Sequence, residues 1–179
     1  MRIRRFDLPD RRRWLRVGEP EWPDPLDATY AQQEGGRWNP PGSFPTLYLN
    51  ADPRTARSQL DHLLDGTPVE VEDLDDDAFR EAGLGGLDLP RTYPLVEDGS
   101  SVPHAVWRII GDAVYAEGLR GVVARSAATP DGGGRELAWF PATSRSRAHP
   151  VWEEPLQLGA WRYATSWNDL DLPGQADLA

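Results

Sequence analysis

The feature that most limits the fold is a switch from strand to helix close to Asp52. Residues 46–50 form a short apolar run with Tyr48 at its centre, which is typical of a strand. Asp52 can cap a helix because its carboxylate accepts backbone N–H bonds, and Pro53 suits the first helical position. The helix that follows has an apolar face at positions i, i+4, i+7 and i+8, made of Ala56, Leu60, Leu63 and Leu64. Gly66 is expected to end it.

A second helix is predicted between Pro103 and Glu117, with Gly118 after its end. Its buried face is expected to consist of Val106, Ile109, Ile110, Ala113 and Val114. Alternating apolar and acidic residues predict a strand at residues 69–72. Further strands are predicted at residues 122–124 and 137–140, and one or two more within residues 152–167. Residues 18–45 are rich in proline and glycine, so they are predicted to be mostly loop.

Helices interleaved with short strands indicate a mixed α/β or α+β fold. The length of 179 residues suffices for one domain with its own core. This single domain is expected to span residues 1–168, and residues 169–179 are expected to be a frayed tail.

The composition excludes several classes of chemistry and location. The chain contains no cysteine, which excludes disulfides, thiolate chemistry and metal sites with Cys ligands. No apolar stretch reaches the roughly 18 residues of a membrane span, and no apolar run typical of a signal peptide follows the basic start. A cytoplasmic protein is therefore expected.

The charge distribution disfavours nucleic acid and metal ions as partners. The formal net charge of −10 repels phosphate backbones, so the arginines within residues 2–16 are better explained as a solvated or paired face. Residues 73–77 are acidic, but no glycine is spaced as in a calcium loop, and a solvated turn is expected. The histidines lack metal-ligand spacing and are predicted to be structural: His62, His104 and His149.

Three places contain residues that could carry chemistry. Residues 35–42 hold Arg37 in a stiff, glycine- and proline-rich backbone, where its guanidinium could clamp a phosphate or form a surface salt bridge. Tyr48 could stack on a planar ligand or belong to the core, and Gln59 flanks the apolar helix face, where it needs a polar partner. Ser126 follows a buried strand and could donate to a phosphate or a ribose. Neither a hydrolase elbow nor a P-loop surrounds it.

These places, in this order, resemble the RES domain, a family named for its Arg, Glu and Ser. The resemblance covers roughly residues 30–145. The motifs that carry it are Gly36-Arg37-Trp38-Asn39-Pro40-Pro41-Gly42, Leu47-Tyr48-Leu49, the helix through Gln59, Gly121-Val122-Val123 up to Ser126, and Leu137 to Phe140.

The resemblance implies a single domain similar in fold to the ADP-ribosyltransferases. It also implies a bacterial toxin that is paired with a helix-turn-helix (Xre-type) antitoxin. Such a toxin acts on NAD without a metal, either degrading it by phosphorolysis or hydrolysis or transferring its ADP-ribose to a protein. A homodimer and a toxin–antitoxin assembly are both compatible with this sequence, and direct binding to nucleic acid or membrane is not expected.

Carried over residue by residue, the resemblance assigns roles to four positions. Arg37 matches the family Arg, which is expected near the NAD phosphates. Tyr48 matches an aromatic residue expected near the nicotinamide, and Ser126 matches the family Ser. The family Glu falls at the position of Gln59, which is the main departure. Two carboxylates near the motifs are candidate substitutes, Glu34 and Glu136.

The departure at Gln59 has physical weight, because the bond to nicotinamide breaks through a ribose with oxocarbenium character. A carboxylate can stabilise that positive charge, and losing one electrostatic group of this kind typically costs about 10²–10³ in rate. Gln59 is compatible with a weakened enzyme, with a non-catalytic NAD or nucleotide sensor, and with an introduced Glu→Gln change that permits production of a toxic protein. If the family roles apply, one cleft should be lined by Arg37, Tyr48, Gln59 and Ser126.

Overall fold

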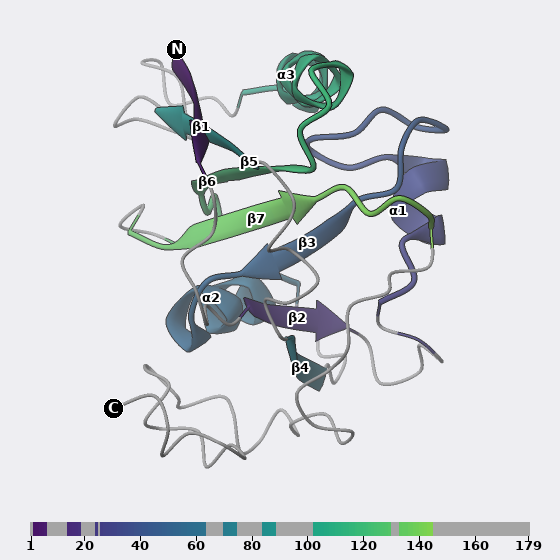
Figure 1. Cartoon of the computed structure of the whole chain (residues 1–179). Helices are drawn as coiled ribbons and strands as arrows, with labels where there is room; N and C mark the ends of the chain where they lie inside the picture. Colours follow the sequence, from purple (N-terminus) through teal and green to yellow (C-terminus); the bar gives the residue numbers. More distant parts are fainter. Residues whose placement is uncertain are drawn as a thin grey trace.

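One sheet runs through the described part of the chain in this computed structural model (Figure 1). The described residues are 2–6, 14–18, 24, 26–63, 70–74, 84–88, 102–129 and 133–144; within 2–6, 60–63, 70–74 and 84–88 only the backbone is described. The strands are β1 Arg2–Phe6, β2 Trp14–Gly18, β3 Leu47–Asn50, β4 Glu70–Leu74, β5 Leu84–Asp88, β6 Gly121–Arg125 and β7 Arg135–Trp139. The helices are α1 Thr29–Glu34, α2 Pro53–Leu63 and α3 His104–Ala116.

In these ranges the sheet has seven strands in the order β1-β5-β6-β7-β3-β2-β4. The pair β5·β6 is parallel, and every other neighbouring pair is antiparallel. Helix α2 packs against β2 and β3, and helix α3 packs against β6. The predicted α+β class is therefore confirmed.

The start of α2 follows from local chemistry, as the sequence predicts. Asp52 Oδ1 accepts the backbone N–H of Thr55 at 2.8 Å, and Asp52 Oδ2 accepts the Thr55 hydroxyl at 2.9 Å. Ala56 is fully buried, in agreement with the predicted apolar face. The side chains of Leu60 and Leu63, and all of Leu64 and Gly66, lie outside the described residues.

The buried face of α3 differs from the prediction. The helix buries Trp107, Gly111 and Val114, whereas Val106 and Ile109 are 45% and 70% exposed and Ala113 is exposed too. The Trp107 ring packs at 5.4 Å from the Trp38 ring, and a Cβ at Gly111 would collide with the Trp38 carbonyl. The helix is turned to this face because the indole has more area to bury and Gly111 permits close approach. The predicted end is confirmed, since Gly118 has a φ of +76°.

Within residues 18–45, which are predicted to be mostly loop, the described residues include one short helix, α1; Asp27 Oδ1 accepts the N–H of Thr29 at 2.8 Å just where α1 begins. One further prediction needs correction. Asp73 is not in a turn, since β4 continues to Leu74 and pairs with β2. The remaining predicted strands and the tail, residues 152–179, lie outside the described residues.

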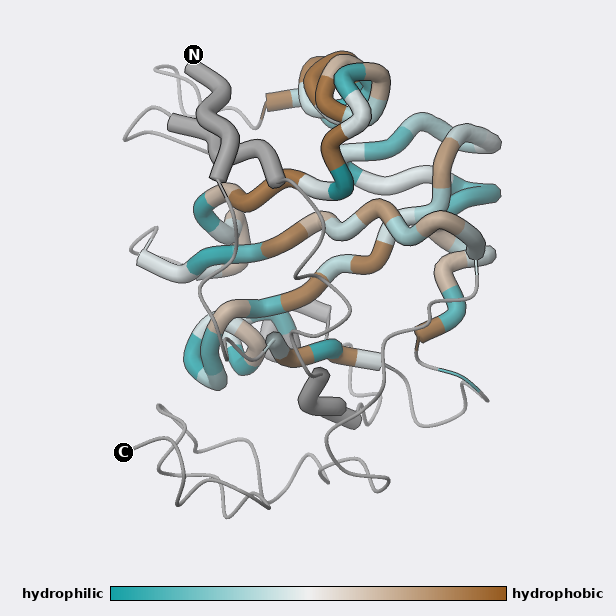
Figure 2. The backbone as a smooth tube through the Cα atoms, in the orientation of Figure 1, coloured by the Kyte–Doolittle hydropathy of each residue, from teal (hydrophilic) through white to brown (hydrophobic). Residues whose placement is uncertain are grey.

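The central strands bury a different set of side chains on each face. One cluster includes Leu47 and Leu49 of β3, Val123 of β6, and Leu137 and Trp139 of β7. The other cluster includes Val122 and Ala124 of β6, Ala138 of β7, Phe140, Trp38, Trp107 and Val114, with Tyr48 packed against it. Figure 2 shows hydrophobic and hydrophilic segments following one another along these strands. Among the helices of the described residues, none is long and apolar enough to cross a membrane.

Candidate functional site

The loop that carries Arg37 is held tightly against β3. Gly35 and Gly42 have φ values of +74° and +71°, which glycine adopts without strain. The N–H of Gly36 donates to the Asn39 carbonyl at 2.9 Å, and a Cβ at Gly36 would collide with the Tyr48 hydroxyl. The glycines therefore allow a turn that closes directly over the Tyr48 ring.

Tyr48 joins this loop to the sheet through its hydroxyl. The hydroxyl accepts the backbone N–H of Trp38 at 3.0 Å and donates to Asn39 Oδ1 at 2.9 Å. Burial raises the pKa of Tyr48 well above its usual range, so it remains a neutral donor. The backbone carbonyl of Tyr48 accepts a 2.9 Å bond from the buried Arg16.

Arg37 forms an ion pair with a carboxylate from a distant strand. Its NH1 lies 2.9 Å from Glu136 Oε1, and the two side chains are 24% and 13% exposed. Trp38 Nε1 donates to the same oxygen at 3.2 Å. Burial raises the pKa of Glu136 above its ordinary value of 4.5, while Arg37, Trp38 and Ser126 favour the ionised form and oppose that shift.

Ser126 lies directly after β6 and is 2% exposed. Its hydroxyl accepts the N–H of Ala128 at 3.2 Å, and its side chain favours the ionised form of Glu136. Its backbone carbonyl accepts the Thr129 hydroxyl at 3.1 Å, which stabilises the turn after the strand. The serine thus has a fixed position beside the buried carboxylate.

Gln59 reaches the same region from α2. Its Oε1 accepts a 2.5 Å bond from Asn50 Nδ2, which supplies the polar partner that the sequence required. Asn50 lies opposite Glu136 in the pairing of β3 with β7. Asn50 therefore connects the helix that carries Gln59 to the strand that carries Glu136.

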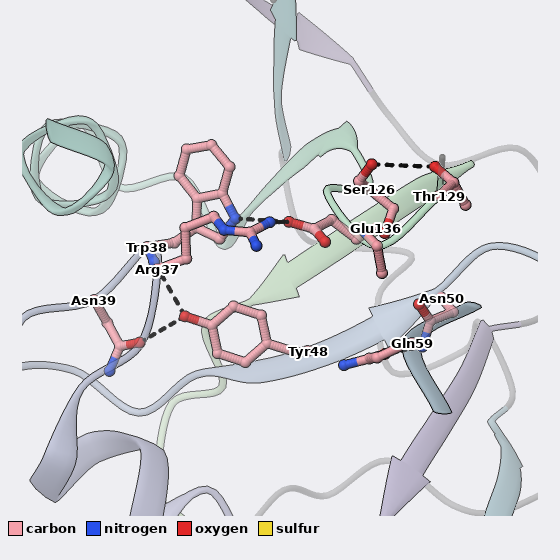
Figure 3. A network of polar contacts seen from close by, with 10 residues as sticks. Arg37, Trp38, Asn39, Tyr48, Asn50, Gln59, Ser126, Thr129 and Glu136 are labelled. Atoms are coloured by element: carbon pink, nitrogen blue, oxygen red, sulfur yellow. Dashed lines mark hydrogen bonds and ion pairs between the residues drawn. The ribbon is translucent and has the colours of Figure 1, made fainter. Parts of the chain in front are cut away.

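The four residues singled out in the sequence come from four separate segments and gather around one end of β3 and β7 (Figure 3). Ser126 and Arg37 are linked by Glu136, Tyr48 holds the loop of Arg37, and Gln59 joins through Asn50. That they bind a ligand there remains a prediction.

Sequence reasoning missed two neighbours and underrated a third. Asn50 is a polar residue at the end of an apolar strand, two positions after Tyr48, and this placement was an available signal. Arg108 donates from Nε to the Gly36 carbonyl at 2.8 Å, but nothing in the helix pattern singled it out. Glu136 was noted only as a candidate substitute, whereas its bonds to Arg37 and Trp38 place it at the centre of the cluster.

Two arginines, Arg37 and Arg108, contribute positive charge beside His104. Burial lowers the pKa of His104, and Arg37 and Arg108 lower it further, so this imidazole is mainly neutral at pH 7. Among the described residues, no group of three or more His, Asp or Glu side chains could hold a metal. The side chain of His62 and all of His149 lie outside those residues.

The arrangement defines a class of protein: a mixed helix-and-sheet domain with an Arg–Glu pair, a serine and a tyrosine gathered at one end of the sheet. A chain in the crystal structure of the M. tuberculosis MbcT-MbcA toxin-antitoxin complex has this fold. It matches with a TM-score of 0.68 and 18% identity, over 88% of this chain and 90% of that chain.

The family model of the RES domain matches residues 13–165. The chain therefore belongs to the RES-domain family, and the resemblance drawn from its short motifs is confirmed over a longer stretch. No curated protein matches the sequence. The position matched to the family Glu in the sequence analysis holds Gln59.

Proposed function

We propose that this protein is a toxin of the RES type that binds NAD and cleaves its nicotinamide–ribose bond. One observation carries the proposal: Arg37, Tyr48, Gln59 and Ser126, which match the family's functional positions, gather at one end of β3 and β7 although they lie far apart in sequence. The domain is proposed to span residues 1–168 and to act in the cytoplasm.

The proposed chemistry breaks the bond between the ribose carbon and the nicotinamide ring nitrogen. The electron pair of that bond leaves with nicotinamide, which becomes neutral, and the ribose carbon gains positive charge. An oxygen of water, of phosphate or of a protein side chain then bonds to this carbon. Water or a protein hydroxyl releases its proton to solvent, and phosphate gives a ribose 1-phosphate.

Each residue of the cluster has a role in this proposal. Arg37 anchors the pyrophosphate, because a guanidinium fork matches phosphate oxygens. Tyr48 packs near the nicotinamide, Ser126 bonds the adjoining ribose or the attacking phosphate, and the side chain of Gln59 faces the scissile bond. The neighbouring cation of Arg108 adds to the attraction for an anionic ligand, since it is close enough to affect His104.

The test is to mix the protein with NAD in the presence and absence of inorganic phosphate, and to measure nicotinamide release. The same assay is run on Gln59→Glu, whose carboxylate can still accept the bond from Asn50. Release by either protein supports the enzyme, and dependence on phosphate separates phosphorolysis from hydrolysis. If neither protein consumes NAD and no protein target is labelled with ADP-ribose, the enzyme reading fails.

A second candidate is a non-catalytic NAD or nucleotide sensor, which the neutral amide of Gln59 favours. A sensor binds NAD without consuming it, and Gln59→Glu changes little. Titration calorimetry with NAD on the parent protein and on Arg37→Ala addresses this reading. Absence of binding to the parent protein would exclude the sensor.

We also propose an antitoxin as partner, because an unchecked NAD-degrading enzyme would kill its host. The similar chain of known structure is part of a toxin-antitoxin complex. A neighbouring gene that encodes a helix-turn-helix protein, and copurification of its product with this chain, would support the proposal. Copurification of a second copy alone would indicate a homodimer instead.

A further inference from the structure

The site contains a carboxylate even though the expected glutamate on α2 is absent. Glu136 is the second residue of β7, and its side chain is only 13% exposed. One oxygen, Oε1, accepts bonds from Arg37 at 2.9 Å and from Trp38 at 3.2 Å. A carboxylate this buried is normally retained only where charged or polar donors surround it, as they do here.

Glu136 also lies beside Ser126, whose hydroxyl has a free proton. The Ser126 oxygen accepts the N–H of Ala128 at 3.2 Å, so its own proton is available to a different acceptor. The Ser126 side chain favours the ionised form of Glu136, in agreement with a hydroxyl whose proton points towards the carboxylate. One carboxylate thus faces both the guanidinium and the hydroxyl of the site.

The position of Glu136 relative to Gln59 suggests why an amide replaces a carboxylate at position 59. Asn50 bonds to Gln59 and lies opposite Glu136 across the paired strands, so positions 59 and 136 flank the same side chain. Two ionised carboxylates on either side of Asn50 would repel each other. A neutral amide at position 59 removes that repulsion and leaves Glu136 as a carboxylate paired with Arg37.

We propose that Glu136 is the positioning carboxylate of this site, and that it supplies from β7 the negative charge that position 59 lacks on α2. The inference rests on the proposed function. Glu136 forms no covalent bond: it holds Arg37 and Ser126 in place, and its charge opposes the positive charge that develops on the ribose. The chain as it stands is therefore an active enzyme.

The experiment measures NAD consumption by the full chain and by Glu136→Gln, with Asp112→Asn as the matched control at an exposed position of α3. Glu136→Gln should lower kcat by about 10²–10³, as loss of one preorganised electrostatic group does, with a smaller change in KM. The parent protein should lose activity on acidification, whereas the residual activity of Glu136→Gln should not. Asp112→Asn should leave the kcat and its pH dependence unchanged.

A relocated charge separates this role from a merely structural one. The double variant Gln59→Glu/Glu136→Gln returns the carboxylate to α2 and should recover a measurable part of the lost kcat. If it folds and binds NAD but recovers nothing, the charge role is wrong. Should Glu136→Gln fail to fold, Glu136→Asp tests the same role, because it keeps the charge on a shorter side chain. Glu136→Asp should lower kcat and should still lose activity at acidic pH. An unchanged kcat overturns the proposal.

The outcomes also distinguish this inference from the function on which it rests. Consumption of NAD by Gln59→Glu but not by the parent protein would overturn the role of Glu136 and leave the proposed function standing. A full rate in Glu136→Gln would do the same. If every variant is folded and none binds or consumes NAD, the proposed function itself fails.

Discussion

The two faces of the central strands β3, β6 and β7 differ in what they bury. One face buries an apolar cluster, with Leu49 of β3 and Leu137 of β7 among its fully buried side chains. The opposite face is apolar around Ala138 and polar around Asn50 and Glu136. The same three strands therefore stabilise the fold on one side and carry a cluster of polar groups on the other.

This difference indicates which side of the sheet contains groups that are unfavourable to bury. Burying an amide or a carboxylate is unfavourable unless donors and acceptors compensate, and each polar side chain of the cluster has such a partner. Asn50 donates a hydrogen bond to Gln59, and Glu136 forms an ion pair with Arg37. Substitutions on the apolar face should therefore change stability, whereas substitutions on the polar face should change activity.

The largest effect is expected on the apolar face. Leu137→Ala removes a fully buried side chain and should lower the free energy of unfolding by about 2–5 kcal/mol. Chemical denaturation measures the loss, and the KM for NAD of the remaining folded protein should not change. A changed KM at full folding would show that the two faces are not independent.

The reciprocal change on the polar face is Ser126→Ala. It should lower the rate of NAD consumption by about 10²–10³, because a positioned hydroxyl beside the reacting ribose is lost. Its free energy of unfolding should change less than that of Leu137→Ala, since no large cavity forms. A wild-type rate in a folded Ser126→Ala protein would remove the serine from the proposed mechanism.

A smaller effect is expected where α3 approaches the loop of Arg37. A Cβ at Gly111 would collide with the Trp38 carbonyl, so Gly111→Ala should cost about 1–3 kcal/mol through overpacking. Ala113→Ser, at an exposed position of the same helix, is the control. Thermal unfolding compares the two variants, and equal melting temperatures would contradict the close packing of α3 on the loop.

The smallest effect is a dependence of stability on pH. Burial raises the pKa of Glu136 above 4.5, so its contribution is most favourable below that value and is lost as pH rises through the raised pKa. The stability of the parent protein relative to Glu136→Gln should therefore fall as pH increases through this range. Melting temperatures of both proteins over a pH series that starts below 4.5 test the sign, and the opposite trend would mean that the pairing with Arg37 outweighs burial.

Local chemistry made several elements predictable from the sequence. The start of α2 depends on Asp52 and Pro53, and the end of α3 depends on Gly118, each acting within a few residues of itself. The strands around Tyr48 and Val122 are apolar runs bounded by turn residues, so they too could be predicted. The motif around Arg37 was specific enough to indicate the family.

The tertiary structure alone decided which face of α3 is buried, because that depends on the packing of Trp107 against Trp38. It also decided that Glu136 pairs with Arg37, which lies 99 positions earlier in the chain. A sequence pattern reports preferences that arise between near neighbours. Ion pairing, burial and pKa shifts arise between residues that meet only when β7 aligns beside β3 and β6. For this reason the sequence determined the residue types of the site, whereas the fold determined which carboxylate lies at its centre.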